Sequence, residues 1–190
     1  MGFRALRWLE SQWPYAALLC AVILLLIVPV WYAGLGLMFT LIYLQIPVYM
    51  LHQFEEHDQD RFRRFANAMF DKEVFTPLSI LVINSLGVWG VDIAALLAAY
   101  FINPALGLIA AYLPVINGIS HIAIAVARRG YNPGLVTSLL LFLPIGGWTI
   151  WVISSQVKPS LGMQLICIGV AILIHAGIMI YVRLRLRKLG

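Results

Sequence analysis

Residues 161–182 read LGMQLICIGVAILIHAGIMIYV, a run without a single charged side chain. A helix that crosses the hydrocarbon of a bilayer needs about 20 predominantly apolar residues, so this run is long enough to span a membrane. Five further apolar runs precede it, at residues 15–32, 35–51, 74–101, 105–127 and 135–155. The pattern predicts an all-α, polytopic bundle of about six transmembrane helices that forms one domain over residues 1–190.

The composition supports a membrane location. Hydrophobic residues make up 62% of the chain and charged residues 11%, and the mean hydropathy is +0.92. A typical soluble domain is about half apolar and a quarter charged. The net charge is +5, but the basic residues stand in short clusters between apolar runs rather than along one face. We therefore expect the lipid bilayer as partner and no nucleic acid.

The distribution of basic residues predicts the orientation. With six spans, the two termini lie on the same side as the second and fourth connections. Twelve of the 13 Lys and Arg residues fall on that side, and Lys158 alone falls on the other. Cytoplasmic segments are enriched in Lys and Arg, so both termini are predicted to be cytoplasmic.

Residues 57–73 are predicted to form a cytoplasmic connection at the membrane interface. Phe62, Phe65 and Met69 would share one apolar stripe of a short helix, and charged residues would occupy its other faces. A cytosolic extension of the second helix is the alternative.

Strongly polar side chains recur at one depth of the predicted bundle. At 100° per residue, His52, Glu55 and Glu56 share one face at the end of the second span, whereas His57 is expected to point away, towards water. Asn117 and His121 are four residues apart and share a face of the fourth span. Other members of the predicted layer are Asn84, Thr137 and His175. At 1.5 Å per residue these groups fall within the cytoplasmic half of the membrane.

Imidazole and carboxylate groups on facing helices are suitable ligands for a first-row divalent metal. We therefore predict a site in which His52, Glu55, Glu56 and His121 are candidate metal ligands. Glu55, Glu56 and Asn117 are also candidate catalytic residues. The pattern does not distinguish zinc from iron or manganese. A single intramembrane histidine such as His175 is more often structural, and Asp92 lies towards the far side and is interpreted as structural.

Three short motifs carry a family resemblance. His52-Gln53-Phe54-Glu55-Glu56 resembles the signature of the HXXEE-domain family, a group of small polytopic membrane proteins. The segments Asn117–His121 and Tyr131-Asn132-Pro133-Gly134 resemble its Asn-x-x-x-His and Tyr-x-Pro-Gly elements, in the same order. The resemblance implies that His52, Glu55, Glu56, Asn117 and His121 are the functional positions, and that Tyr131, Pro133 and Gly134 shape the turn into the fifth span. It implies no reaction.

Three classes of function remain open from the sequence. The first is a metal-dependent membrane enzyme, a hydrolase, oxidoreductase or isomerase, acting on a lipid or another apolar small molecule. The second is a proton- or metal-ion-coupled transporter, and the third is a non-enzymatic membrane assembly or partner protein. The four histidines are too few for the desaturase and hydroxylase families, and no H-E-x-x-H motif is present. The sequence does not determine the oligomeric state.

Overall fold

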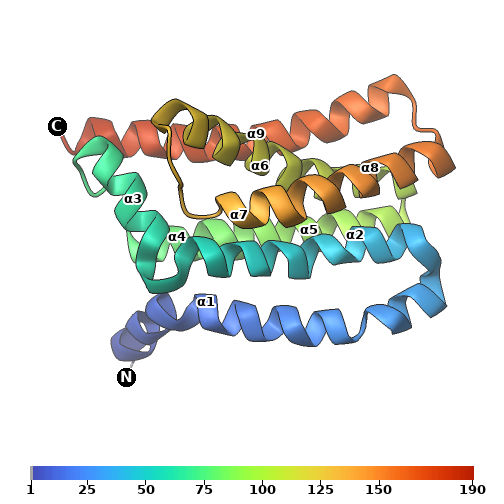
Figure 1. The fold of residues 1–190 in the computed structure, drawn as a ribbon, viewed down its shortest axis with the longest axis horizontal. Helices are drawn as coiled ribbons and strands as arrows, with labels where there is room; N and C mark the ends of the chain where they lie inside the picture. Colours follow the sequence, from blue (N-terminus) through green and yellow to red (C-terminus); the bar gives the residue numbers. More distant parts are fainter. Residues whose placement is uncertain (1) are drawn as a thin grey trace.

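The computed structural model describes residues 2–190, which form helices joined by short connections, with no strand in that range (Figure 1). The short elements η1 and η3 are 3₁₀ turns, and η2 and η4 are π-helical. In chain order the elements are α1 (Gly2–Leu26), α2 (Val28–His57), η1 (Asp58–Asp60), α3 (Arg61–Phe70), α4 (Pro77–Val82), η2 (Ile83–Trp89), α5 (Gly90–Phe101), η3 (Pro104–Gly107), α6 (Leu108–Arg128), α7 (Leu135–Thr137), η4 (Ser138–Phe142), α8 (Leu143–Val157) and α9 (Leu161–Lys188).

Six helical runs are long and apolar enough to cross a membrane. They are Arg7–Leu26, Val28–Phe70, Pro77–Phe101, Pro104–Arg128, Leu135–Val157 and Leu161–Lys188. The predicted all-α bundle of six apolar helices is thereby confirmed, and the architecture is that of a multi-pass membrane protein. The fourth, fifth and sixth runs extend beyond the predicted apolar segments because backbone hydrogen bonding continues into the polar ends. The first run ends at Leu26 rather than at residue 32, and the third begins at Pro77 rather than at residue 74. Gly36, whose φ of 74° is not helical, kinks α2 close to the predicted connection at residues 33–34.

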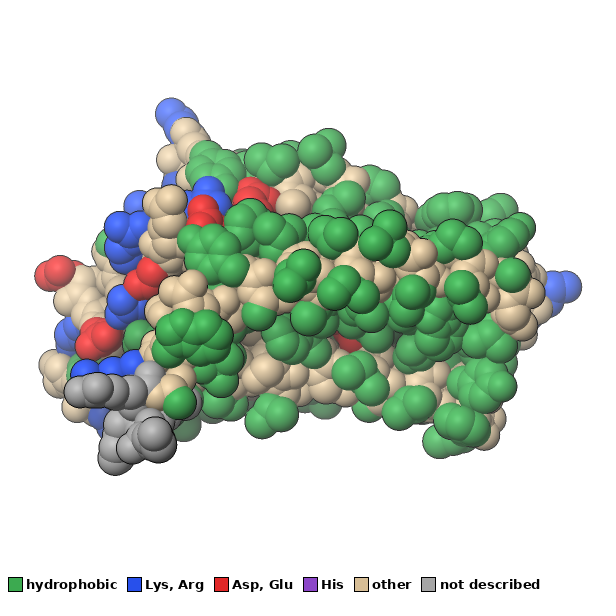
Figure 2. Space-filling view, turned by 90° about the horizontal axis from the view of Figure 1, so that it is seen from below, with side chains coloured by type: hydrophobic (Ala, Val, Ile, Leu, Met, Phe, Trp, Pro, Cys, Tyr) green, Lys and Arg blue, Asp and Glu red, His purple; other side chains and the backbone are tan. Residues whose placement is uncertain are grey.

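Charged side chains gather at one end of the bundle. Both ends of the chain lie at this end, together with α3 (Figure 1). The face shown in Figure 2 is apolar along most of its length, and most of its charged groups lie at the same end, although one basic side chain projects at the opposite end. The connection between α2 and α4 contains α3, whose position at a membrane interface stays a prediction.

Local sequence signals explain where several helices begin. Thr76 and Ser79 form a reciprocal capping box around Pro77, which occupies the first turn of α4. Ser160 accepts a hydrogen bond from the backbone N–H of Met163 at the start of α9. These caps fix the entry of α4 and α9 into the bundle.

The centre of the bundle is α2, which packs against α1, α5, α6 and α8. Its second half is almost completely buried, from Thr40 to Met50 and again at His52, Gln53, Glu56 and His57. The buried face therefore continues from an apolar stretch into a polar one. This continuation carries polar side chains into the interior of the bundle.

Candidate metal centre

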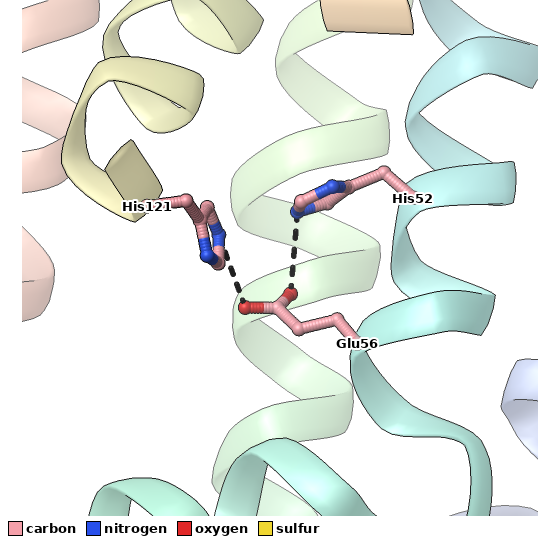
Figure 3. Close-up of side chains that lie close together, drawn as sticks. All are labelled: His52, Glu56 and His121. Carbon is pink, nitrogen blue, oxygen red and sulfur yellow. Dashed lines mark ion pairs between the residues drawn. The ribbon is translucent and has the colours of Figure 1, made fainter. Parts of the chain in front are cut away.

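Three polar side chains meet inside the bundle. His52 and Glu56 lie one helical turn apart near the end of α2, so both project from the same face. His121, from α6, faces them (Figure 3). His52 is fully buried, and Glu56 and His121 are only 7% and 5% exposed. The cluster is therefore withdrawn from both water and the outer surface of the bundle.

The dimensions of the cluster suit a metal ion. One Glu56 carboxylate oxygen is 3.7 Å from Nε2 of His52, and the other is 3.6 Å from Nε2 of His121 (Figure 3). Ligand atoms of the three residues all lie within 4.8 Å of one another. Ligands held at about 2.1 Å from a tetrahedral ion are roughly 3.4 Å apart. His52, Glu56 and His121 could thus hold a divalent metal with small side-chain shifts.

Asn132 determines which nitrogen of His121 carries the proton. Its amide nitrogen donates to the backbone carbonyl of His121 at 2.9 Å, so its carbonyl oxygen faces the ring. That oxygen lies 2.6 Å from Nδ1 of His121 and must accept a proton from it. In the neutral ring, Nε2 of His121 therefore presents a lone pair towards Glu56.

Thr137 has the same effect on His52. The Thr137 hydroxyl donates to a Glu55 carboxylate oxygen at 2.5 Å, so its only proton is already engaged. Nδ1 of His52 lies 2.8 Å from this hydroxyl oxygen and must donate to it. Nε2 of His52 is then unprotonated, and it has no hydrogen-bond partner among the described residues.

Three acceptors thus converge in a buried volume. Two imidazole lone pairs and a carboxylate repel one another unless a cation lies between them. The separations of 3.6 and 3.7 Å are too long for a proton shared in a normal hydrogen bond. A divalent ion would satisfy all three groups together, and the outer partners of both imidazoles already orient them as metal ligands are oriented.

Gly134 forms part of the boundary of this cluster. Its φ of +95° is in the left-handed region, which glycine adopts without strain. A Cβ atom at this position would lie 2.7 Å from Cε1 of both His52 and His121. The turn into α7 therefore requires glycine for two reasons, its backbone conformation and its contact with both imidazoles.

Glu55 lies apart from the three-residue cluster. Its carboxylate accepts hydrogen bonds from the backbone N–H groups of Val136 and Thr137 at 3.1 and 2.7 Å. It also accepts from the hydroxyls of Thr137 and Tyr131, the latter at 2.9 Å. Partial burial and the bond to Glu55 raise the pKa of Tyr131 to about 12, so this phenol stays a donor at neutral pH. These contacts stabilise the first turn of α7, and a role for Glu55 as metal ligand or catalyst stays a prediction.

His57 is buried, and its predicted exposure to water was wrong. It is 5% exposed, and its Nε2 lies 3.1 Å from a Glu56 carboxylate oxygen. The ring of Trp13 packs 4.9 Å from the His57 ring. Packing of α1 against this end of α2 covers the side of the helix that the angular projection assigned to water.

The remaining polar candidates lie around the cluster rather than in it. Asn117 donates to the hydroxyl of Tyr49 at 3.0 Å, and His175 donates to the carbonyl of Ala171 at 2.8 Å. A cavity of about 210 Å³ is bordered by both of these residues and by Glu56, His57 and His121. Asp92 is fully buried on α5, outside this cavity, and its two carboxyl oxygens have no hydrogen-bond partner among the described residues.

Asn132→Ala should weaken metal binding, because it removes the acceptor that fixes the tautomer and orientation of His121. Loss of such an outer partner typically lowers metal affinity by about 10–100-fold. Competition titration against a fluorescent chelator measures the change. Asn103→Ala, which removes an asparagine cap at the start of η3, is the control and should leave the affinity unchanged. Equal affinities for Asn132→Ala and the wild type would contradict the assignment.

Sequence reasoning missed the parts played by Asn132 and His57. Asn132 occupies the variable position of the Tyr-x-Pro-Gly element, and a polar residue there, close after His121, was the available signal. For His57 the available signal was its position next to Glu56 in the sequence, because a neighbour of Glu56 lies close to the cluster whichever way its side chain points.

Comparisons with known proteins agree with the motifs. Residues 43–149, more than half of the chain, match the family model described as "Protein of unknown function with HXXEE motif". The match includes His52, Glu56, His121 and Gly134. Searches of the curated proteins and of the solved structures found no match.

Proposed function

The chain belongs to the HXXEE family, and since that family has no assigned function, we propose one from the site. The protein is a metal-dependent membrane enzyme that acts on a lipid or another apolar substrate. His52, Glu56 and His121 bind a divalent ion. The observation that carries this proposal is the convergence of Nε2 of His52 and Nε2 of His121 on the Glu56 carboxylate, at 3.7 and 3.6 Å, with no donor between them among the described residues.

The number of ligands favours catalysis over a structural metal. Structural zinc sites are closed by four protein ligands, whereas catalytic sites keep three and leave a position open. Here two of the three ligands, Glu56 and His121, border a cavity of about 210 Å³ in which a substrate group or water could complete the coordination. Bound metal would polarise a substrate oxygen or lower the pKa of a bound water. Asn117, which borders the same cavity, would position the substrate. His57, which lies beside Glu56, would exchange protons with the substrate.

The types of the three ligands favour two main classes of reaction, hydrolytic and oxidative. Two imidazoles and one carboxylate form catalytic zinc sites in hydrolases and non-haem iron(II) sites in oxygenases. Identifying the bound metal therefore separates a hydrolytic from an oxidative reaction. An enzyme that is active without metal would instead point to acid–base isomerisation by Glu56 and the histidines.

The orientation is part of the proposal. The end of the bundle that gathers α3, both termini and most of the charge would face the cytoplasm, since cytoplasmic segments are rich in Lys and Arg. The cluster lies near the end of α2 and close to this end of the bundle. Its substrate would then be drawn from the cytoplasmic leaflet.

Transport is the second candidate, and Asp92 is the observation that favours it. Buried ionisable groups in membrane helices often mark ion pathways, and within residues 2–190 the carboxyl of Asp92 has no hydrogen-bond partner. Metal and proton flux into proteoliposomes distinguishes the two functions. A flux that is lost in Asp92→Asn would favour a transporter over an enzyme.

His121→Ala should lose the metal that the purified wild-type protein retains, because two ligands cannot hold it against a chelator wash. Elemental analysis of protein purified in detergent gives the stoichiometry and the identity of the metal. His175→Ala is the matched control, since His175 borders the same cavity but is not part of the cluster. We expect about one metal per chain in the wild type and in His175→Ala. Equal metal content in His121→Ala and the wild type would refute the proposed centre.

A further inference from the structure

A groove runs along the surface of the bundle between α9 and the helix formed by α4 and η2. Its volume is about 410 Å³, within the range of about 300–1,000 Å³ that is usual for small-molecule sites. Apart from Thr76, Ser79 and Tyr181, its lining consists of apolar side chains and glycine. Leu78 and Val82 on its rim are 45% and 44% exposed, so the groove is open to the surroundings of the bundle.

The groove adjoins the cavity beside the metal cluster. Ile83, Val88 and Ile178 border both spaces. The cavity in turn reaches Glu56 and His121. An apolar chain that lies in the groove could therefore place an adjoining group at the cluster without crossing a polar surface.

One end of the groove is closed by polar contacts. The Tyr181 hydroxyl donates to the carbonyl of Val74 at 3.3 Å, and Arg185 donates to the carbonyls of Val74 and Glu73 at 3.4 and 3.2 Å. These bonds join the charged end of α9 to the connection before α4. Access along the groove is thus sideways, from the surface that lipid chains cover, rather than from water.

Two glycines keep the groove open. Gly87, in the π-helical segment η2, and Gly177, in α9, both line it. A Cβ atom at either position would meet no heavy atom within 4 Å. Neither glycine is required for close helix packing, and π-helical segments such as η2 occur frequently at functional sites. A larger side chain at either position would occupy the groove and leave the protein around it undisturbed.

We propose that this groove binds the long hydrocarbon chain of the substrate, which enters sideways from the bilayer and brings a lipid's reactive group to the cluster. The proposal rests on the proposed metal-dependent enzyme and specifies its substrate class as a long-chain lipid. Lipid chains are the apolar molecules that surround the open side of the groove in a membrane. Its position beside the cavity, with which it shares Ile83, Val88 and Ile178, is the observation that favours this groove as the chain-binding site.

Photocrosslinking tests the proposal without knowledge of the reaction. The probe is a long-chain fatty acid with a diazirine near the middle of its chain, added to the full-length protein in phosphatidylcholine nanodiscs. Crosslinked residues are mapped by mass spectrometry in the wild type, Gly87→Leu, Gly177→Leu and Gly169→Leu. Gly169 is the matched control: it lies on α9, has equal open space around its Cβ position and does not line the groove. Metal content is measured on the same four samples.

The wild type is expected to crosslink mainly through groove residues such as Ile83 and Ile178. Crosslinking there should fall by about tenfold, or roughly 1.4 kcal/mol of binding free energy, in Gly87→Leu and Gly177→Leu, and stay unchanged in Gly169→Leu. Metal content should be the same in all four proteins. Labelling spread evenly over the outer faces of α9, or unaffected by the two leucines, would overturn the groove proposal whatever the metal content. Groove labelling in protein without metal would support chain binding and refute the metal centre instead.

Discussion

Glu56→Gln is expected to abolish metal binding, whereas Glu55→Gln, one residue earlier, should bind a full equivalent of metal at saturation. Both Glu56 oxygens face imidazole nitrogens of the cluster. An amide there supplies no negative charge and turns a donor towards one lone pair. The loss of metal affinity should exceed the roughly 10–100-fold loss that removal of an outer hydrogen-bond partner causes. Elemental analysis measures the metal content of each variant, and chelator competition measures its metal affinity.

Glu55→Gln is the matched control because it changes the neighbouring residue in the same way. The Glu55 carboxylate stabilises the start of α7 through charge-assisted hydrogen bonds. Its replacement should lower the free energy of unfolding by about 1–3 kcal/mol and move the thermal midpoint downwards. Because Thr137 links Glu55 to His52, a moderate loss of metal affinity is expected as well. If Glu55→Gln lost metal completely and Glu56→Gln did not, the assignment of the two carboxylates would be reversed.

Gly134→Ala should eliminate the metal and destabilise the protein at the same time. The added methyl would lie 2.7 Å from both imidazole rings, so at least one ring must move away from Glu56. A residue with a side chain in the left-handed region adds strain of about 1–2 kcal/mol. The metal content, measured by elemental analysis, and the thermal unfolding midpoint should therefore both fall.

Gly130→Ala is the control for this substitution. Gly130 lies in the same connection between α6 and α7, and a Cβ there would lie 3.9 Å from the Arg128 carbonyl oxygen, an ordinary van der Waals contact. We expect normal metal content and nearly normal stability. A Gly134→Ala protein with unchanged metal content would mean that the two imidazoles are not held where the structure has them.

The fold and the meeting of α2 with α6 followed from simple features of the sequence. Apolar runs of sufficient length require helices in a membrane, since the backbone has no other partner there. His52 and His121 could be matched because depth along a helix is set by a fixed rise per residue.

The different roles of Glu55 and Glu56 did not follow from the sequence. Both carboxylates project from roughly the same face, and several side-chain torsions decide where each one lies. The donors that hold Glu55 come from Tyr131, Val136 and Thr137, in a turn whose path depends on Gly134. Likewise, the burial of His57 depends on how α1 packs beside α2, which no helical projection contains.

The origin of the three proposed ligands on two separate helices has a consequence for biogenesis. His52 and Glu56 leave the ribosome well before His121, and Asn132 and Gly134, which orient the imidazoles, follow later still. A nascent chain that has inserted only α1 to α5 carries just two of the ligands. Loading of the proposed ion would therefore be a late step of membrane insertion, after the turn into α7 has closed over both imidazoles.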